Sequence, residues 1–433
     1  EIMPSLVGSE MCIRDRLESV VNQFKLRGSW GELGNQNTSN LYPFYEILPV
    51  KSNSGNWLVN GGKTNTADIP SLVSTLLTWE RVRSFNVGFD FGAFSNRLTG
   101  SFDYFVRKTV DMVGPAPQLP LVLGIAPAIV NNADMKSYGF EIELSWRDRI
   151  GEVDYGVKFN LADAQQKVVK YPNTTNAFSD WYAGKMSGEI WGYTSLGIAK
   201  TDEEMKEHLA SLPNGGQNQL GNKWGAGDIM YADINGDGKV DGGKGTLADP
   251  GDQRIIGNST PRYNFGLVLD ASYKGFDVSI FFQGVGKRDY APIVGTNGAV
   301  FWGAVNNIWQ SMAMEEHFDY FRPEGHPMGA NLNGYYPRPD FTSNKNHQVQ
   351  TRYLQDASYI RLKNLQIGYT LPKQWINKLH INRCRVYVSG DNLWTGTSLA
   401  SMFDPETLAA GDWGSGKTYP LSKVISFGLN VNF

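Results

Sequence analysis

The stretch "YGFEIELSW", Tyr138 to Trp146, places an aromatic or aliphatic residue at every second position. The residues between them are glycine, glutamate or serine. Because successive side chains of a β-strand point to opposite faces, this pattern predicts a strand with one apolar and one polar face. A second alternating run, "VDYGVKFNLADA" from Val153 to Ala164, follows after the short linker "RDRIGE". The two runs together predict an antiparallel hairpin with a short turn.

The same alternation recurs along the whole chain. It predicts strands near residues 24–30, 81–92, 98–109, 137–146, 153–170, 262–272, 276–285, 357–370, 381–390 and 423–433. The short connections fall near 93–97, 147–152, 273–275 and 371–380, and the long ones near 31–80, 110–136, 171–261, 286–356 and 391–422. Every second connection is therefore short, as in outer-membrane barrels with short periplasmic turns and long extracellular loops. A soluble β-sandwich also alternates, but its loops are not sorted in this way.

Composition agrees with this fold class, an all-β transmembrane antiparallel barrel with long extracellular loops. Aromatic residues make up 12% of the 433 residues, glycine occurs 48 times and only 19% are charged. No apolar run reaches the length of about 18 residues that a transmembrane helix needs, whereas barrel strands look only half apolar. The net charge of −3 gives no basic field for nucleic acid. Two cysteines, Cys12 and Cys384, form no disulfide framework or metal motif.

Several residues bear on how the strands are placed in a membrane. Tyrosine and tryptophan at predicted strand ends suit interfacial girdles, although ordinary core or surface packing explains them too; these residues are Trp146, Tyr263, Tyr273 and Tyr369. The last strand alternates up to Phe433, and if that end is periplasmic the short turns are periplasmic as well. The polar residues Glu141, Glu143, Lys158 and Asn160 face either a wet lumen or the outside of a soluble barrel, and the sequence does not decide between them.

The first sixteen residues, "EIMPSLVGSEMCIRDR", do not resemble native protein. They lack the apolar region of a signal peptide and show no sustained period. The segment "LVGSEMCIRD" is what CTC GTG GGC TCG GAG ATG TGT ATA AGA GAC encodes, and that DNA resembles a transposase-type sequencing-library adapter. We therefore expect 1–16 to be a translation artefact and 17–433 to be the C-terminal portion of the barrel, cut from a longer gene at Leu17.

Longer phrases point to a family. The segments "KLRGSWGELGNQN", "LTWERVRSFNVGFDFGAFSNRLTGSFDYF", "DINGDGKVD", "GDQRIIGNSTPRYNFGL" and "SYIRLKNLQIGYTLP" occur in this order. With them, residues 17–433 resemble the C-terminal half of SusC/RagA-type TonB-dependent outer-membrane transporters of Bacteroidetes. The resemblance implies about the last ten strands of a 22-stranded barrel in the cell outer membrane. It also implies import of oligosaccharide or peptide fragments, with TonB and a SusD-like surface lipoprotein as partners. The family's signal peptide, TonB box, plug and N-terminal sandwich are not in this sequence.

One motif predicts a metal site. The segment "DINGDGKVD" places oxygen ligands at positions 1, 3, 5, 7 and 9 of a calcium loop, with Gly238 at position 6; the predicted ligands are Asp233, Asn235, Asp237, the Lys239 carbonyl and Asp241. Position 12 departs from the pattern, because Lys244 replaces the usual glutamate, and Asp249 or Asp252 would have to complete the shell. The alternative is a solvated Asp/Asn/Gly-rich turn. We expect no other cofactor.

Enzyme motifs are weak. The segment "GDWGSGKT", residues 411–418, matches a phosphate-binding loop, but Tyr419 and Pro420 follow where the helix should open. The five histidines are scattered, and the loop carboxylates Asp319, Glu324 and Asp404 show no catalytic spacing. We therefore predict that the chain is not an enzyme.

Aromatic residues in the long loops are candidate substrate contacts, because flat rings pack on sugar or peptide groups while keeping a polar edge. The six candidates are Trp181, Trp191, Trp302, Trp309, Trp394 and Trp413. The alternative for each is packing within the loops or against the lid partner. Three functional readings remain open: the importer, a secreted Ca²⁺-stabilised β protein that binds or cleaves glycans, and a passive porin-like barrel.

Overall fold

The structure is a computed structural model that describes residues 20–36, 45–70, 72–74, 76–116, 120, 122, 124–125, 127–292, 299–302, 313–340, 345–377, 380–408 and 418–433. The segment 1–16, Cys12 and Leu17 lie outside these residues. So do Trp309, Trp413 and most of the sequence 411–418.

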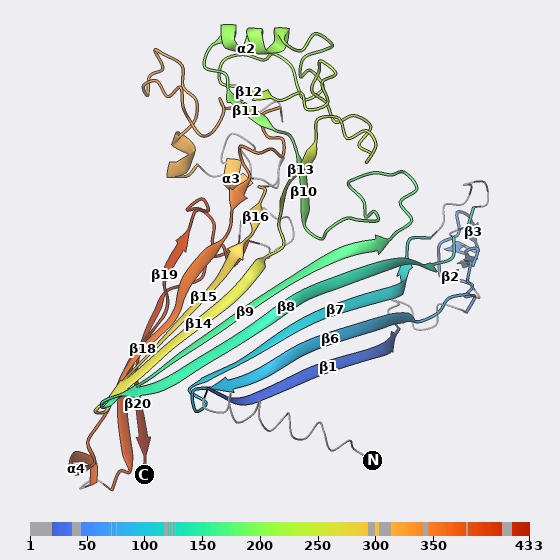
Figure 1. Cartoon of the computed structure of the whole chain (residues 1–433). Helices are drawn as coiled ribbons and strands as arrows, with labels where there is room; N and C mark the ends of the chain where they lie inside the picture. The colour runs from blue at the N-terminus through green and yellow to red at the C-terminus, as the bar shows by residue number, and fades with distance from the viewer. Residues whose placement is uncertain are drawn as a thin grey trace, which may run out of the picture.

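The described residues form one antiparallel sheet of ten strands, arranged in chain order (Figure 1). The strands are β1 (Val21–Asn35), β6 (Glu80–Ala93), β7 (Leu98–Gly114), β8 (Val130–Ile150), β9 (Val153–Lys170), β14 (Arg262–Tyr273), β15 (Phe276–Lys287), β18 (Tyr359–Thr370), β19 (Arg383–Thr397) and β20 (Val424–Asn432). Each corresponds to one of the predicted strands. The sheet is strongly curved, as part of a barrel wall would be.

Several strands extend beyond their predicted ends, mostly toward the long loops; β1 continues to Asn35, and β8 also extends at its other end, to Ile150. β7 continues to Gly114 and β8 begins at Val130, so much of the predicted loop 110–136 is strand. β19 continues to Thr397, which places Trp394 in a strand rather than in a loop. These extensions carry polar residues such as Asn131 and Asn132, so the alternation ends although the ladder of hydrogen bonds continues.

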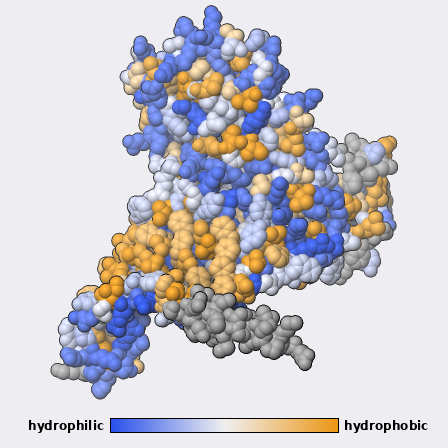
Figure 2. Space-filling model, in the orientation of Figure 1, coloured by the Kyte–Doolittle hydropathy of each residue, from blue (hydrophilic) through white to orange (hydrophobic). Residues whose placement is uncertain are grey.

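The two faces of the sheet differ in chemistry. One cross-strand row is apolar: Leu26, Phe89, Phe102, Ile142, Leu161 and Phe265. The adjacent row, on the opposite face, is polar: Lys25, Asp90, Ser101, Glu143, Asn160, Gly266 and Gln283. On the apolar face, Phe24, Phe89 and Phe102 stack in sequence with ring centroids 5.8 and 5.6 Å apart. Figure 2 shows the resulting hydrophobic band, with hydrophilic surface above it and below it.

Connections differ between the two ends of the sheet. At one end the links are short, and left-handed residues tighten them, for example Gly151 (φ 61°) and Gly275 (φ 90°). The link 371–382 contains α4 (Lys373–Ile376). At the other end, the first long loop carries two nested antiparallel pairs: the outer pair is β2 (Val50–Lys51) with β5 (Thr66–Ala67), and the inner pair is β3 (Leu58–Val59) with β4 (Gly62–Lys63). The predicted alternation of short and long connections is confirmed.

Three of the long loops fold together into a unit that we call the loop domain, comprising the described parts of 171–261, 288–358 and 398–408. Its pairs of strands are β10 (Glu189–Gly192) with β13 (Arg254–Asn258), β11 (Ser195–Ile198) with β12 (Ile229–Tyr231), and β16 (Asp289–Tyr290) with β17 (Gln355–Asp356). Its helices are α2 (Asp202–Ala210), α3 (Ala299–Trp302) and the 3₁₀ turn η4 (Glu315–Phe318). It lies over the ends of β14, β15, β18 and β19 (Figure 1).

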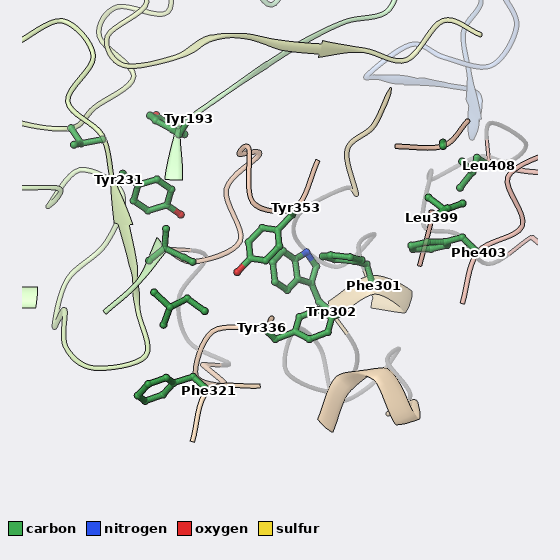
Figure 3. Close-up of a cluster of buried hydrophobic side chains, with 14 of the residues drawn as sticks. Tyr193, Tyr231, Phe301, Trp302, Phe321, Tyr336, Tyr353, Leu399, Phe403 and Leu408 are labelled. Atoms are coloured by element: carbon green, nitrogen blue, oxygen red, sulfur yellow. The ribbon is translucent and has the colours of Figure 1, made fainter. Parts of the chain in front are cut away.

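The loop domain has its own hydrophobic core (Figure 3). The core residues come from all three loops: Tyr193, Ile198, Leu212, Ile229, Tyr231 and Val240 from the first, Phe301, Trp302, Phe321, Tyr336, Tyr353 and Ala357 from the second, and Leu399, Phe403 and Leu408 from the third. Trp302 is central, with its ring edge-on to Tyr353 at 4.6 Å. Since each loop contributes side chains to a shared core, we infer that no one of them holds this conformation alone.

Among the described residues, no helix combines the length and the apolar character needed to span a membrane.

Candidate functional site: a polar sheet face and a pocket in the loop domain

The polar face of the sheet is held together by charge pairs between strands. The Arg27 guanidinium donates to Asp90 on β6 at 2.8 Å and to Asp103 on β7 at 2.7 Å. Further along, Arg385 on β19 pairs with Asp277 on β15. Outer-membrane barrels keep their polar face inside, so we assign this face to the lumen.

Four polar residues whose side of the sheet the sequence left open can now be placed. Glu141, Glu143, Lys158 and Asn160 lie on the polar face, since each is in register with the polar rows of its neighbours. Glu143 and Asn160 line a depression of about 600 Å³ in that face. The lumen wall therefore carries acidic, basic and amide side chains that can form hydrogen bonds with a solute in the lumen.

A second hollow lies in the loop domain, which we call the loop pocket. Its volume is about 350 Å³ and it is lined by Phe178, Ser179, Lys185, Glu189, Trp191, Gly192, Tyr193, Gln253, Gln348 and Val349. Phe178 and Trp191 stack nearly parallel, with ring centroids 4.5 Å apart and planes 20° from each other. Gln253 and Gln348 add amide groups to the lining. Flat rings beside amides and charges suit a ligand that has both apolar faces and hydroxyl or amide groups.

Local hydrogen bonds fix the charged groups of the loop pocket. The Lys185 ammonium donates to the carbonyls of Phe178 at 2.8 Å and Asp180 at 2.7 Å. Burial lowers the pKa of Lys185. The Tyr182 hydroxyl donates to Glu189 at 2.5 Å. Burial, together with this bond to a carboxylate, raises the pKa of Tyr182 to about 12, so the phenol stays protonated and acts as a donor.

The structure separates the six tryptophan candidates. Trp191 lies in the loop pocket, and Trp181 lies near it, 40% exposed, with its ring 5.7 Å from the Lys185 ammonium. Trp302 is 1% exposed in the core, as the packing alternative describes. Trp394 is paired with Leu362 on the apolar face of the sheet, away from the lumen. Trp309 and Trp413 lie outside the described residues.

The predicted calcium loop is compact and well hydrogen-bonded. Asp233 accepts from the backbone of Gly236 at 2.6 Å and of Gly238 at 2.8 Å. Asn235 and Asp237 each accept from the backbone two residues ahead. The Asp241 carboxylate is buried and pairs with the Lys239 ammonium at 2.5 Å. Within the described part of the chain no three His, Cys, Asp or Glu residues are grouped closely enough to hold a metal. Calcium binding stays a prediction.

The other two carboxylates considered for this loop are placed differently. Asp252 is buried and accepts from the backbone of Ile234 at 2.7 Å and of Asp241 at 2.8 Å. Burial raises the pKa of Asp252. Asp249 accepts from Lys244 through its backbone carbonyl. Asp252 thus organises the loop from its inner side by binding amides.

Sequence reasoning missed a buried charge cluster in the loop domain, which we call the Asp228 cluster. Asp228 is fully buried and accepts from Lys345 at 2.8 Å, from Asn346 at 2.9 Å and from two nitrogens of Arg338 at 2.7 and 2.6 Å. Lys345 is also buried, and its ammonium lies 5.0 Å from the Trp224 ring. More than a hundred residues separate Asp228 from these partners, so no local pattern could reveal the cluster.

A second missed cluster joins the loop domain to the sheet. Arg361 on β18 points from the polar face and donates to Asp404 at 2.7 Å and Glu406 at 2.8 Å. Lys363 donates to the other oxygen of Glu406 at 2.7 Å. Asp404, one of the carboxylates weighed for catalysis, is therefore engaged in positioning the third loop.

Together, a curved antiparallel sheet with one apolar and one polar face, short turns at one end and a folded loop domain at the other define an integral outer-membrane β-barrel. Comparison with known proteins identifies the family. The family "TonB dependent receptor-like, beta-barrel" matches residues 19–393. The chain belongs to this family, and within it resembles the SusC/RagA group.

Curated relatives and solved structures agree. The chain is 28% identical to the TonB-dependent receptor P3 of Formosa agariphila over 96% of its own length. It is 21% identical to the TonB-dependent receptor SusC of Bacteroides thetaiotaomicron. A chain from the structure of the RagAB peptide transporter superposes with a TM-score of 0.68 at 22% identity, covering 97% of this chain and 42% of that one. The chain spans about 40% of the length of the curated relatives it matches. The family is one of receptors, which agrees with the prediction that the chain is not an enzyme.

Proposed function

We propose that this chain is part of a transporter that imports oligosaccharide or peptide fragments across the outer membrane, energised through TonB. The observation that carries the proposal is the loop pocket, which places the stacked rings of Phe178 and Trp191 beside two amides in a domain at the end of a polar-faced sheet. In this proposal the loop pocket binds the substrate and carries out no chemical reaction on it. We further propose a SusD-like surface lipoprotein as the partner that covers the loop domain.

The test compares uptake by bacteria that carry the intact transporter with Trp191→Ala, or with Trp375→Ala as the control, since Trp375 is an exposed tryptophan in α4 at the short-turn end of the sheet. Radiolabelled oligosaccharide and peptide pools are supplied separately. We expect Trp191→Ala to lower uptake of one pool at least tenfold and the control to leave it within twofold. Equal uptake by both variants, with the same amount of protein in the membrane, would show that the loop pocket does not bind substrate.

The energy source is tested in the same strains. Deletion of tonB should abolish uptake by the unmodified transporter. Uptake that persists without TonB would instead favour the passive porin-like barrel. The soluble glycan-binding alternative is set aside, because the chain belongs to a family of membrane barrels.

A further inference from the structure

A row of basic residues crosses four neighbouring strands of the sheet. In register across the strands, Arg83 on β6 lies opposite Lys108 on β7. Lys108 lies opposite Lys136 on β8, and Lys136 lies opposite Lys167 on β9. We call these four residues the basic row. Directly opposed residues have Cβ atoms only about 5 Å apart, so four positive charges stand side by side.

The basic row lies on the apolar face of the sheet, the face away from the lumen. The next row on this face lies two residues along each strand from the basic row, toward the short turns. It consists of Phe85, Val106, Tyr138 and Gln165. Two residues further along each strand lies the row of Val87, Tyr104, Phe140 and Asp163, in which the Asp163 carboxylate is paired with Arg262. The Lys136 ammonium lies 5.0 Å from the centre of the Tyr138 ring, which confirms that both side chains share this face. The basic row therefore borders the apolar surface on its long-loop side.

Little negative charge balances the basic row. Glu32 on β1, at one end, accepts from Arg83 at 2.7 Å. Among the described residues, no carboxylate forms an ion pair with Lys108, Lys136 or Lys167. The next charged residue outward on β6, Arg81, is by contrast paired with Asp111 at 2.5 Å. Like charges directly opposite one another on neighbouring strands are destabilising, so an external anion would relieve the repulsion.

We propose that the basic row binds the phosphate groups of an anionic lipid headgroup in the outer leaflet of the outer membrane. The apolar surface on one side of the row contacts acyl chains, and Tyr138 lies where an interfacial aromatic residue is expected. Adjacent strands are about 4.8 Å apart, so the row is about 14 Å long, enough for a headgroup with two phosphates. Lysine and arginine are the side chains that bind phosphate as charged donors. Substrate, which passes on the lumen side, does not reach this face.

The test measures binding of a bisphosphorylated glycolipid to the intact transporter in neutral detergent. The variant is Lys108→Gln with Lys136→Gln and Lys167→Gln. The matched control removes three positive charges from the polar face of strands β1, β7 and β9, as Lys25→Gln with Arg107→Gln and Lys158→Gln. A Lys→Arg version of the three row lysines keeps the charge. Heat-modifiable migration on gels verifies that each barrel is folded, and the dephosphorylated glycolipid and inorganic pyrophosphate serve as comparison ligands.

We expect the row variant to bind the bisphosphorylated lipid about a hundredfold more weakly, because each basic residue near an anionic surface contributes about a fivefold gain. The control and the Lys→Arg version should stay within threefold of the unmodified protein. The dephosphorylated lipid should bind weakly to all of them. The proposal is overturned if the row variant and the control lose affinity equally, or if removing the phosphates changes nothing. It is also overturned if pyrophosphate binds as tightly as the lipid, since the site would then be one for free anions.

Discussion

The sheet and the loop domain bury their apolar side chains against different surroundings. In the sheet, large apolar residues remain open on one face; Leu26 is 72% exposed and Phe427 is 82% exposed. In the loop domain, Phe301 and Trp302 are each 1% exposed within a closed core. The sheet depends on lipid to cover its apolar face, whereas the loop domain covers its own. Away from the cluster of Arg361 and Asp404 that joins the two regions, a change to one region should leave the other intact, and the following predictions test this independence.

The largest effect is expected in the Asp228 cluster. Asp228→Asn leaves the buried Lys345 ammonium without its main counter-charge, and loss of one partner of a buried pair costs about 3–5 kcal/mol. The loop domain should open, which limited proteolysis and amide hydrogen exchange would detect, while the sheet keeps its protection. Asp68→Asn is the control, since the Lys51–Asp68 pair is exposed and such pairs contribute little. Loss of protection in the sheet as well would show that the two regions are not independent.

A charged substitution on the apolar face of the sheet is expected to destabilise the sheet and leave the loop domain folded. Ile280 on β15 is opposite Leu269 and Leu365 on the apolar face, whereas its neighbour Ser279 is opposite Asp270 on the polar face. Ile280→Arg should destabilise the barrel by about 2–4 kcal/mol, because arginine would face the hydrocarbon. Ser279→Arg should be tolerated. Urea unfolding of barrels reconstituted in liposomes measures both, and equal effects would contradict the assignment of the two faces.

A smaller effect follows from pH and should be confined to the loop domain. Burial lowers the pKa of His347 to about 4, although Asp340 acts in the other direction, and the ring stacks 4.1 Å from Trp302. An unfolded histidine titrates near 6.5. Between pH 6.5 and 4 the unfolded state therefore binds the extra proton, and the stability of the loop domain falls as pH falls. The slope for one group is at most about 1.4 kcal/mol per pH unit. His347→Gln should reduce the slope, and an unchanged slope in this variant would contradict the role of His347.

The smallest effect concerns the predicted calcium loop, for which we propose Ca²⁺ binding by Asp233, Asn235, Asp237, the Lys239 carbonyl and Asp241. A ligand at ten times its dissociation constant stabilises the folded state by about 1.4 kcal/mol. Ca²⁺ should accordingly raise the melting temperature of the loop domain by a few degrees, and EDTA should reverse this. Asp233→Asn should remove the response. If Ca²⁺ gives neither heat in calorimetry nor a shift in melting, the segment is a solvated turn.

The sheet was predictable and the loop domain was not, for a physical reason. A strand that separates lipid from a lumen must alternate, so runs such as Tyr138 to Trp146 show their two faces directly in the sequence. The loop domain depends on contacts between distant residues, such as Asp228 with Lys345, which no periodicity records. For the same reason the sequence proposed Trp191, now in the loop pocket, together with Trp302, now in the core. Phe178, which stacks on Trp191, was missed because a single aromatic residue in a loop carries no pattern.

The order of the strands has a consequence for how the molecule forms. Every strand of the sheet pairs with its neighbour in sequence, so the sheet can grow one hairpin at a time. The core of the loop domain joins Tyr193 to Phe301 and Leu408, so it closes only after the chain has passed through β19. Contacts of such long sequence separation form slowly because they must bring distant segments together. The loop domain is thus the last part to mature, and a closed loop pocket signals that the wall below it is already in place.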